Sequence, residues 1–183
     1  YVIVDIPAYV ANTVANTDST TISESLTVTA NTDTTVTSPA VTETVQEPKV
    51  TLTKDITGIT YNNADGSATV TYTDTLTNTG DATAYGVALN DPLATSNESY
   101  PSNRPTYSGD ATSEGTGGAL PAVVGNAVTA NLTLGIGKSE TITYTVNLAD
   151  VTKGAAESTA VVQWLSLPGV TQGASTTGGQ DQS

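Results

Sequence analysis

Three charged residues fall where the hydrophobic pattern predicts buried side chains, and their types could do chemistry. Lys54 follows Val50 and Leu52 at period-two spacing, so its ammonium group is expected on the inward face of a strand. Asp74 and Asp91 stand in phase with the apolar residues of two later strands. A charge buried alone is very costly, so these groups should either pair or reach water at a strand end.

Two weaker candidate sites lie in the loop-rich segment 91–118. Asp91 and Glu98 could offer carboxylate oxygens to Ca²⁺, although the chain has no D-x-D-x-D-G loop. Asn97 opens an Asn-Glu-Ser sequon and is a candidate for N-glycosylation, whereas Asn131 opens another within a predicted strand. The competing interpretations are ordinary solvated acidic turns and chance tripeptides.

The composition excludes several classes of function. The chain of 183 residues has no Cys and no His, so it lacks thiolate metal ligands and the usual acid–base triads. We therefore expect no enzymatic activity and no resident cofactor. Eighteen acidic residues against five basic ones give a net charge of −13, which argues against nucleic-acid partners. No apolar run approaches the roughly 18 residues of a membrane helix, so this segment should not insert into a membrane.

The elements that must position these residues are β-strands. Apolar residues alternate with Thr along most of the chain, which is typical of strands with one buried and one wet face. Turn residues such as Ala64-Asp65-Gly66 and Asn78-Thr79-Gly80-Asp81 separate the strands. The sequence predicts an all-β sandwich of antiparallel sheets, with inward-facing residues that include Val50, Leu52, Ile56, Val70, Tyr72, Leu76, Val87, Leu89, Val128, Leu132, Leu134, Ile142, Tyr144, Val146 and Trp164.

Several motifs carry a resemblance to a known family. Residues 47–54 read EPKVTLTK, residues 70–87 contain VTYTDTLTNTGDATAYGV, and Asp91-Pro92-Leu93 follows. Together with residues 150–154 and 162–169, they resemble a repeat of bacterial and archaeal surface proteins known as domain of unknown function eleven. The resemblance covers residues 47–170. It implies an immunoglobulin-like β-sandwich repeated in tandem and implies no catalytic activity.

The same resemblance predicts how the chain is divided. Residues 47–170 would form the immunoglobulin-like repeat, and residues 171–183 a flexible tail or linker. Residues 1–46 would be the terminal strands of a preceding repeat, or a segment donated as a strand to a neighbouring copy. The simpler alternative is that residues 1–46 pack on their own chain, which needs no partner.

Three interpretations of Lys54 remain open at this point. Its ammonium group could snorkel to a sheet edge. It could form a buried ion pair with Asp74 or Asp91. It could also form an intramolecular isopeptide crosslink, resembling those of other surface immunoglobulin-like adhesin domains, in which a Lys, an Asn or Asp and a nearby carboxylate meet in an apolar setting. Against the crosslink, Ser158 stands where the family tends to carry an Asn before its last strand.

The functional expectation is an extracellular structural repeat at a cell surface or in a secreted filament. It would act as a spacer or filament subunit, and strand donation would join copies head to tail. The alternative is an adhesin module whose 91–118 loop binds a carbohydrate or a surface protein, with Tyr100 and Tyr107 as the aromatics available there.

Overall fold

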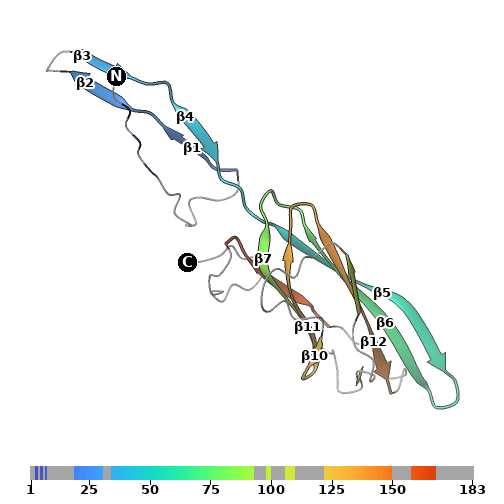
Figure 1. Cartoon of the computed structure of the whole chain (residues 1–183). Coiled ribbons are helices and arrows are strands. Elements are labelled where there is room, and N and C mark those ends of the chain that lie inside the picture. The colour runs from blue at the N-terminus through green and yellow to red at the C-terminus, as the bar shows by residue number, and fades with distance from the viewer. Residues whose placement is uncertain are drawn as a thin grey trace.

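The computed structural model describes residues 3, 5, 7, 19–30, 34–92, 98–99, 106–109, 122–149 and 158–167. Every regular element in these ranges is a β-strand, which confirms the predicted all-β class. Within the same ranges no helix is long and apolar enough to cross a membrane. The described strands form a sandwich of two antiparallel sheets, preceded by a narrow two-stranded arm (Figure 1).

The first sheet places the candidate charged residues Lys54 and Asp74 side by side. Its main strands, in spatial order, are β5 (Val50–Asn62), β6 (Ser67–Asn78) and β12 (Ser139–Leu148). Two short strands from the 91–118 segment, β8 (Glu98–Ser99) and β9 (Thr106–Gly109), pair with the far side of β12. The β5–β6 turn uses the predicted chemistry, since the Asp65 carboxylate accepts a hydrogen bond from the Ser67 amide and Gly66 has φ 74°.

The second sheet lies across from the first and carries Asp91. Its strands, in spatial order, are β10 (Ala122–Val124), β11 (Ala127–Leu134), β7 (Ala84–Pro92) and β13 (Val161–Leu165). All of the pairings are antiparallel. The core between the two sheets consists of alternate residues from both, namely Val50, Leu76, Ala84, Val87, Leu89, Val128, Ala130, Leu132, Leu134, Ile142, Tyr144, Val146 and Trp164.

One predicted core residue is not buried. Ile56 was expected inside with Leu52, but 57 % of its surface is exposed. A β-bulge follows it on β5, where the register with β6 shifts between Ile56 and Gly58. Ile56 itself still lies opposite Tyr72, so it keeps the inward phase, and its exposure goes with its place on β5, the edge strand that pairs only with β6 among the described strands. In Figure 1 the β5–β6 hairpin extends past the rest of the sandwich in this region.

The arm consists of two strand pairs that follow one another along a single ribbon. The pair β1 (Thr21–Glu24) with β4 (Val41–Thr44) lies nearer the sandwich, and β2 (Thr27–Ala30) with β3 (Thr34–Thr37) lies farther out. The ribbon points away from the sandwich in Figure 1, and β4 leads into β5 through residues 45–49. The side chains described along the arm are almost all exposed.

Candidate functional site

Charged side chains from both sheets meet inside the sandwich. Lys54 on β5 and Asp74 on β6 are directly opposite one another in the antiparallel register, and Ile142 on β12 continues the same row. The next row holds Tyr72 and Tyr144 as partners. Because residues opposite one another in a sheet share a face, this alternation carries the ammonium and carboxyl groups inward together with the core residues.

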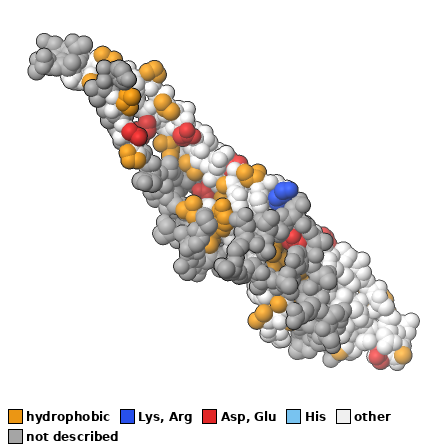
Figure 2. Space-filling view, viewed as in Figure 1, with side chains coloured by type: hydrophobic (Ala, Val, Ile, Leu, Met, Phe, Trp, Pro, Cys, Tyr) orange, Lys and Arg blue, Asp and Glu red, His pale blue; other side chains and the backbone are white. Residues whose placement is uncertain are grey.

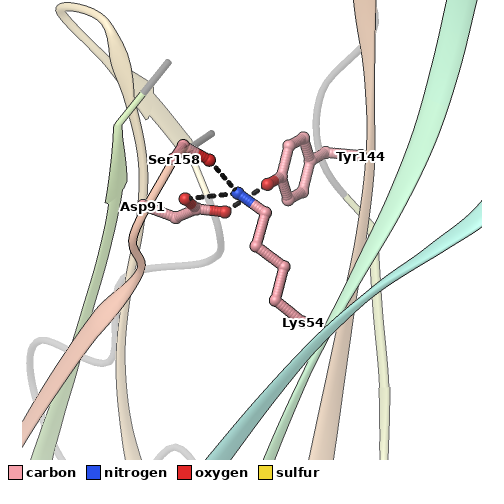
Figure 3. A network of polar contacts seen from close by, with 4 residues as sticks. All are labelled: Lys54, Asp91, Tyr144 and Ser158. Carbon is pink, nitrogen blue, oxygen red and sulfur yellow. Dashed lines mark hydrogen bonds and ion pairs between the residues drawn. The ribbon is translucent and has the colours of Figure 1, made fainter. Parts of the chain in front are cut away.

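Lys54 reaches across the sandwich to Asp91 on β7. Its Nζ lies 2.8 Å from Oδ1 of Asp91, where the Asp91 side chain is fully buried and that of Lys54 is 19 % exposed. Nζ also donates a hydrogen bond to Oγ of Ser158, just before β13. The Tyr144 hydroxyl donates to the second Asp91 oxygen, Oδ2. Figure 3 shows Nζ next to the Asp91 carboxylate and Ser158, with Tyr144 approaching from the sheet that also carries Lys54.

Two aromatic rings line the approach of the lysine. Tyr72 and Tyr144 are stacked, with ring centroids 5.5 Å apart and planes inclined by 21°. The Lys54 Nζ lies 4.8 Å from the Tyr72 centroid and 5.9 Å from the Tyr144 centroid. Both distances are within cation–π range, so the negative ring faces help to hold the ammonium charge in an environment with little water.

Asp74 is the unusual member of the cluster. Its side chain is completely buried, and its neighbour is the Asp91 carboxyl group, to which Asp74 can donate a hydrogen bond when it is protonated. Burial, and then the negative charge of Asp91, raise the pKa of Asp74 to about 8, while the positive charge of Lys54 works in the opposite direction. At neutral pH Asp74 is therefore mainly a neutral acid beside an ion pair.

The sequence pattern placed Lys54, Asp74 and Asp91 inward, and the structure brings all three together. Of the partners considered for Lys54, the ion pair forms with Asp91. The sequence pattern alone assigned no role to Tyr144 or to Ser158. Tyr144 could have been found, since it stands in inward phase on its strand. Ser158 lies before β13 and outside the strand, so no alternating pattern predicts the direction of its side chain.

The other predicted sites fall largely outside the described residues. Both carboxylate oxygens of Asp91 are engaged by Lys54 and Tyr144, and the Glu98 side chain lies outside the described part, so the Ca²⁺ site stays a prediction. No group of three potential metal ligands occurs among the residues that the structure describes. The glycosylation candidate Asn97 lies outside them, as do the side chains of Tyr100 and Tyr107.

Two comparisons with known proteins found no match for this chain. No protein-family model matches it, and no curated protein matches it. The resemblance to the surface-protein repeat therefore remains a prediction from the motifs.

Proposed function

We propose that this chain is a non-enzymatic structural repeat of an extracellular bacterial or archaeal surface protein, with an immunoglobulin-like sandwich, and that it serves as a filament subunit. The observation that carries the proposal is the arm at residues 19–45. Among the described residues it projects from the sandwich as a two-stranded ribbon that pairs with no other strand and leaves apolar side chains exposed (Figure 1). A subunit that donates strands to its neighbour needs an arm of this kind.

The outer half of the arm presents an exposed apolar pair on one face. Val28 and Val36 are cross-strand partners with 55 % and 65 % of their surfaces exposed. The opposite face carries the pair Thr27 and Thr37, whose hydroxyl groups are hydrogen-bonded at 3.1 Å. In Figure 2 hydrophobic and acidic side chains are interspersed along the arm. The arm thus has one face suited to burial and one suited to water.

A second copy of the chain is the partner we favour for this face. An isolated two-stranded ribbon is only marginally stable in water, so the arm gains most by packing on another sheet. The sandwich offers an extended strand for such an addition, because β5 has 13 residues and pairs only with β6 among the described strands. An exposed strand edge offers unpaired backbone groups to an incoming strand.

The remaining surface suits a molecule that must stay soluble in an ordered array. Threonines cover the outer face of the first sheet. There the hydroxyl groups of Thr77 on β6 and Ser139 on β12 are hydrogen-bonded at 2.9 Å. The net charge of −13 makes copies repel one another. Salt screens that repulsion, so assembly should be favoured at higher ionic strength.

Sedimentation and negative-stain electron microscopy over a range of protein and salt concentrations test the proposal. Wild-type protein is expected to form filaments or oligomers whose yield rises with both concentrations. Val28→Lys and Val36→Lys should abolish them, because they place a charge in the buried contact. Thr27→Lys and Thr37→Lys are matched controls on the opposite face and should leave assembly intact.

Two outcomes would contradict the proposal that copies assemble through the apolar face of the arm. A monomer under all conditions would exclude the filament subunit and leave the tandem spacer, in which neighbouring residues of a longer chain cover the arm. Assembly that is equally insensitive to all four substitutions would show that copies meet through another surface. The adhesin alternative depends on the 91–118 segment, and no contact among its described residues favours it.

A further inference from the structure

The cluster around Lys54 contains one more carboxyl group than its ion pair requires. Lys54 and Asp91 already balance one another at 2.8 Å. Asp74 lies directly opposite Lys54 in the register, fully buried and next to the Asp91 carboxyl group. A second buried acid is a costly feature if the cluster only ties two sheets together, because it stays uncharged only by holding its proton. Such an acid is useful where a proton has to be given and taken back.

We propose that Nζ of Lys54 and Cγ of Asp91 condense to an amide, so that a covalent side-chain bond joins β5 of one sheet to β7 of the other. Asp74 serves as the proton carrier, and Tyr144 and Ser158 act as positioning residues. This crosslink goes beyond the proposed function, since it forms within one chain whether or not copies assemble.

The reaction balances without any external reactant. A proton first passes from the Lys54 ammonium group to the Asp91 carboxylate. The nitrogen lone pair then attacks Cγ, which forms the C–N bond and moves an electron pair onto one carboxyl oxygen. Asp74 protonates the hydroxyl group, which leaves as water when the C–O bond breaks, and Asp74 then takes up the proton that the nitrogen loses. One water molecule is released, and Asp74 ends as the neutral acid it was at the start.

The buried setting makes the first proton transfer accessible. Removing two opposite charges from water is unfavourable for each ion, so a neutral amine and a neutral acid come much closer in free energy to the ion pair than they do in solution. The raised pKa of Asp74 reports the same lack of solvent around its carboxyl group. An amide buries no net charge, so its formation relieves the penalty that the ion pair carries.

The fold holds the Lys54 amine and the Asp91 carboxyl group in the orientation that the condensation needs. Holding an amine against a carboxyl group replaces a bimolecular encounter, an advantage that corresponds to effective concentrations of about 10⁵ M or more in well-oriented systems. The Tyr144 hydroxyl already donates to Oδ2 of Asp91, where it would stabilise negative charge developing on that oxygen. Ser158 accepts a hydrogen bond from Nζ on the side of β13 and fixes the direction of the amine (Figure 3).

Intact-mass spectrometry of the denatured, purified chain tests the proposal directly. The expected mass is that of the sequence less one water molecule. Lys54→Arg keeps a positive charge but replaces the amine by a guanidinium, so this variant should show its full calculated mass. Lys49→Arg changes a lysine that is exposed and outside the cluster, and its mass should be one water lower than calculated, as in the wild type.

Tryptic digestion of the denatured protein locates the bond. Trypsin cuts after free Lys54 but not after an acylated one, and the Arg104–Pro105 bond resists it. The linked protein should therefore yield one peptide, 50–138, lighter by one water molecule. The unlinked protein should yield peptides 50–54 and 55–138. Fragmentation of the linked peptide should assign the lost water to Lys54 and Asp91.

Asp74→Asn tests the role of the proton carrier. The amide side chain has similar size and cannot donate and recover a proton in the same way, so this variant should be folded by near-ultraviolet circular dichroism yet retain its full mass. A link that forms to the same extent in Asp74→Asn would overturn the role assigned to Asp74. Folded wild-type protein that keeps its full mass would overturn the crosslink itself, whatever its state of assembly.

Discussion

Ser166 donates a 2.7 Å hydrogen bond from its hydroxyl group to the carboxylate of Glu47, which ties the residue after β13 to the segment before β5. Next to it, the indole Nε1 of Trp164 donates to the carbonyl oxygen of Pro48 at 3.2 Å. The first strand of the sandwich therefore begins where the last described strand ends.

Ser166→Ala is expected to loosen this end of the sandwich. The substitution removes a hydrogen bond to a carboxylate that is only partly buried, so we expect a loss of about 1 kcal/mol in the free energy of unfolding. Urea denaturation measures the total, and hydrogen exchange should show faster opening at β13 and at residues 47–50. Thr60→Ala, at an exposed position of β5, is the control and should change neither quantity.

Asn78→Asp should lower the stability of the fold strongly, although the two side chains have nearly the same shape. Asn78 is fully buried, and its Nδ2 donates to the carbonyl oxygens of Ala82 at 2.8 Å and Leu134 at 3.0 Å. A carboxylate there would face those oxygens with no proton to give. Leaving a buried charge unpaired is expected to cost about 3 kcal/mol or more. Thermal unfolding checks this, and acid conditions that protonate the new carboxyl group should restore part of the loss.

Gly80 and Gly58 form a matched pair for alanine substitution. A Cβ at Gly80 would lie 2.4 Å from the carbonyl oxygen of Glu47 and 2.4 Å from the amide nitrogen of Lys49, both of them backbone atoms. A Cβ at Gly58 would meet only the Thr71 side chain at 3.5 Å, an ordinary contact. We expect Gly80→Ala to cost about 2 kcal/mol through forced backbone movement. Gly58→Ala should be close to neutral, and equal effects of the two would contradict the close approach of residues 47–49 to Gly80.

The ionisation of Asp74 should make stability fall as pH rises. The unfolded chain loses the Asp74 proton near the ordinary value of 3.8, whereas the ion-paired fold holds it to about pH 8. The folded state thus binds more protons between these values, and the free energy of unfolding should decrease across that window by an amount on the order of a few kcal/mol. Below pH 3.8 the stabilising contribution of the Asp74 proton is fully present, and above about pH 8 it is lost.

Lys54→Arg provides the background for measuring this effect, because it keeps the positive charge and cannot form the amide. Urea denaturation of Lys54→Arg and of Lys54→Arg with Asp74→Asn, from about pH 4 to about pH 9, should show a decline only when Asp74 is present. Parallel curves for the two proteins would mean that Asp74 titrates near its ordinary pKa, and hence that water reaches its carboxyl group.

Alternation along the strands was sufficient to predict which face most residues occupy. It predicted the burial of Leu76, Val128 and Ile142, and it also placed Lys54 and Asp74 inward despite their charge. It failed at Ile56, which keeps the inward phase opposite Tyr72 but lies on the edge strand β5, where 57 % of its surface is exposed. Period-two reasoning is local, so it predicts the face of a side chain but not whether another layer covers that face.

The sequence by itself determined the all-β class, the strand faces, the turn at Asp65 and Gly66, and the presence of inward charges. Each of these follows from neighbours a few residues apart. Only the tertiary structure decided that Lys54 pairs with Asp91, because the two residues lie on strands of different sheets and 37 positions apart in the chain. The same holds for Ser158, which is 104 positions from Lys54. Such contacts depend on how the two sheets stack and twist. No local sequence pattern encodes which residues of different sheets meet.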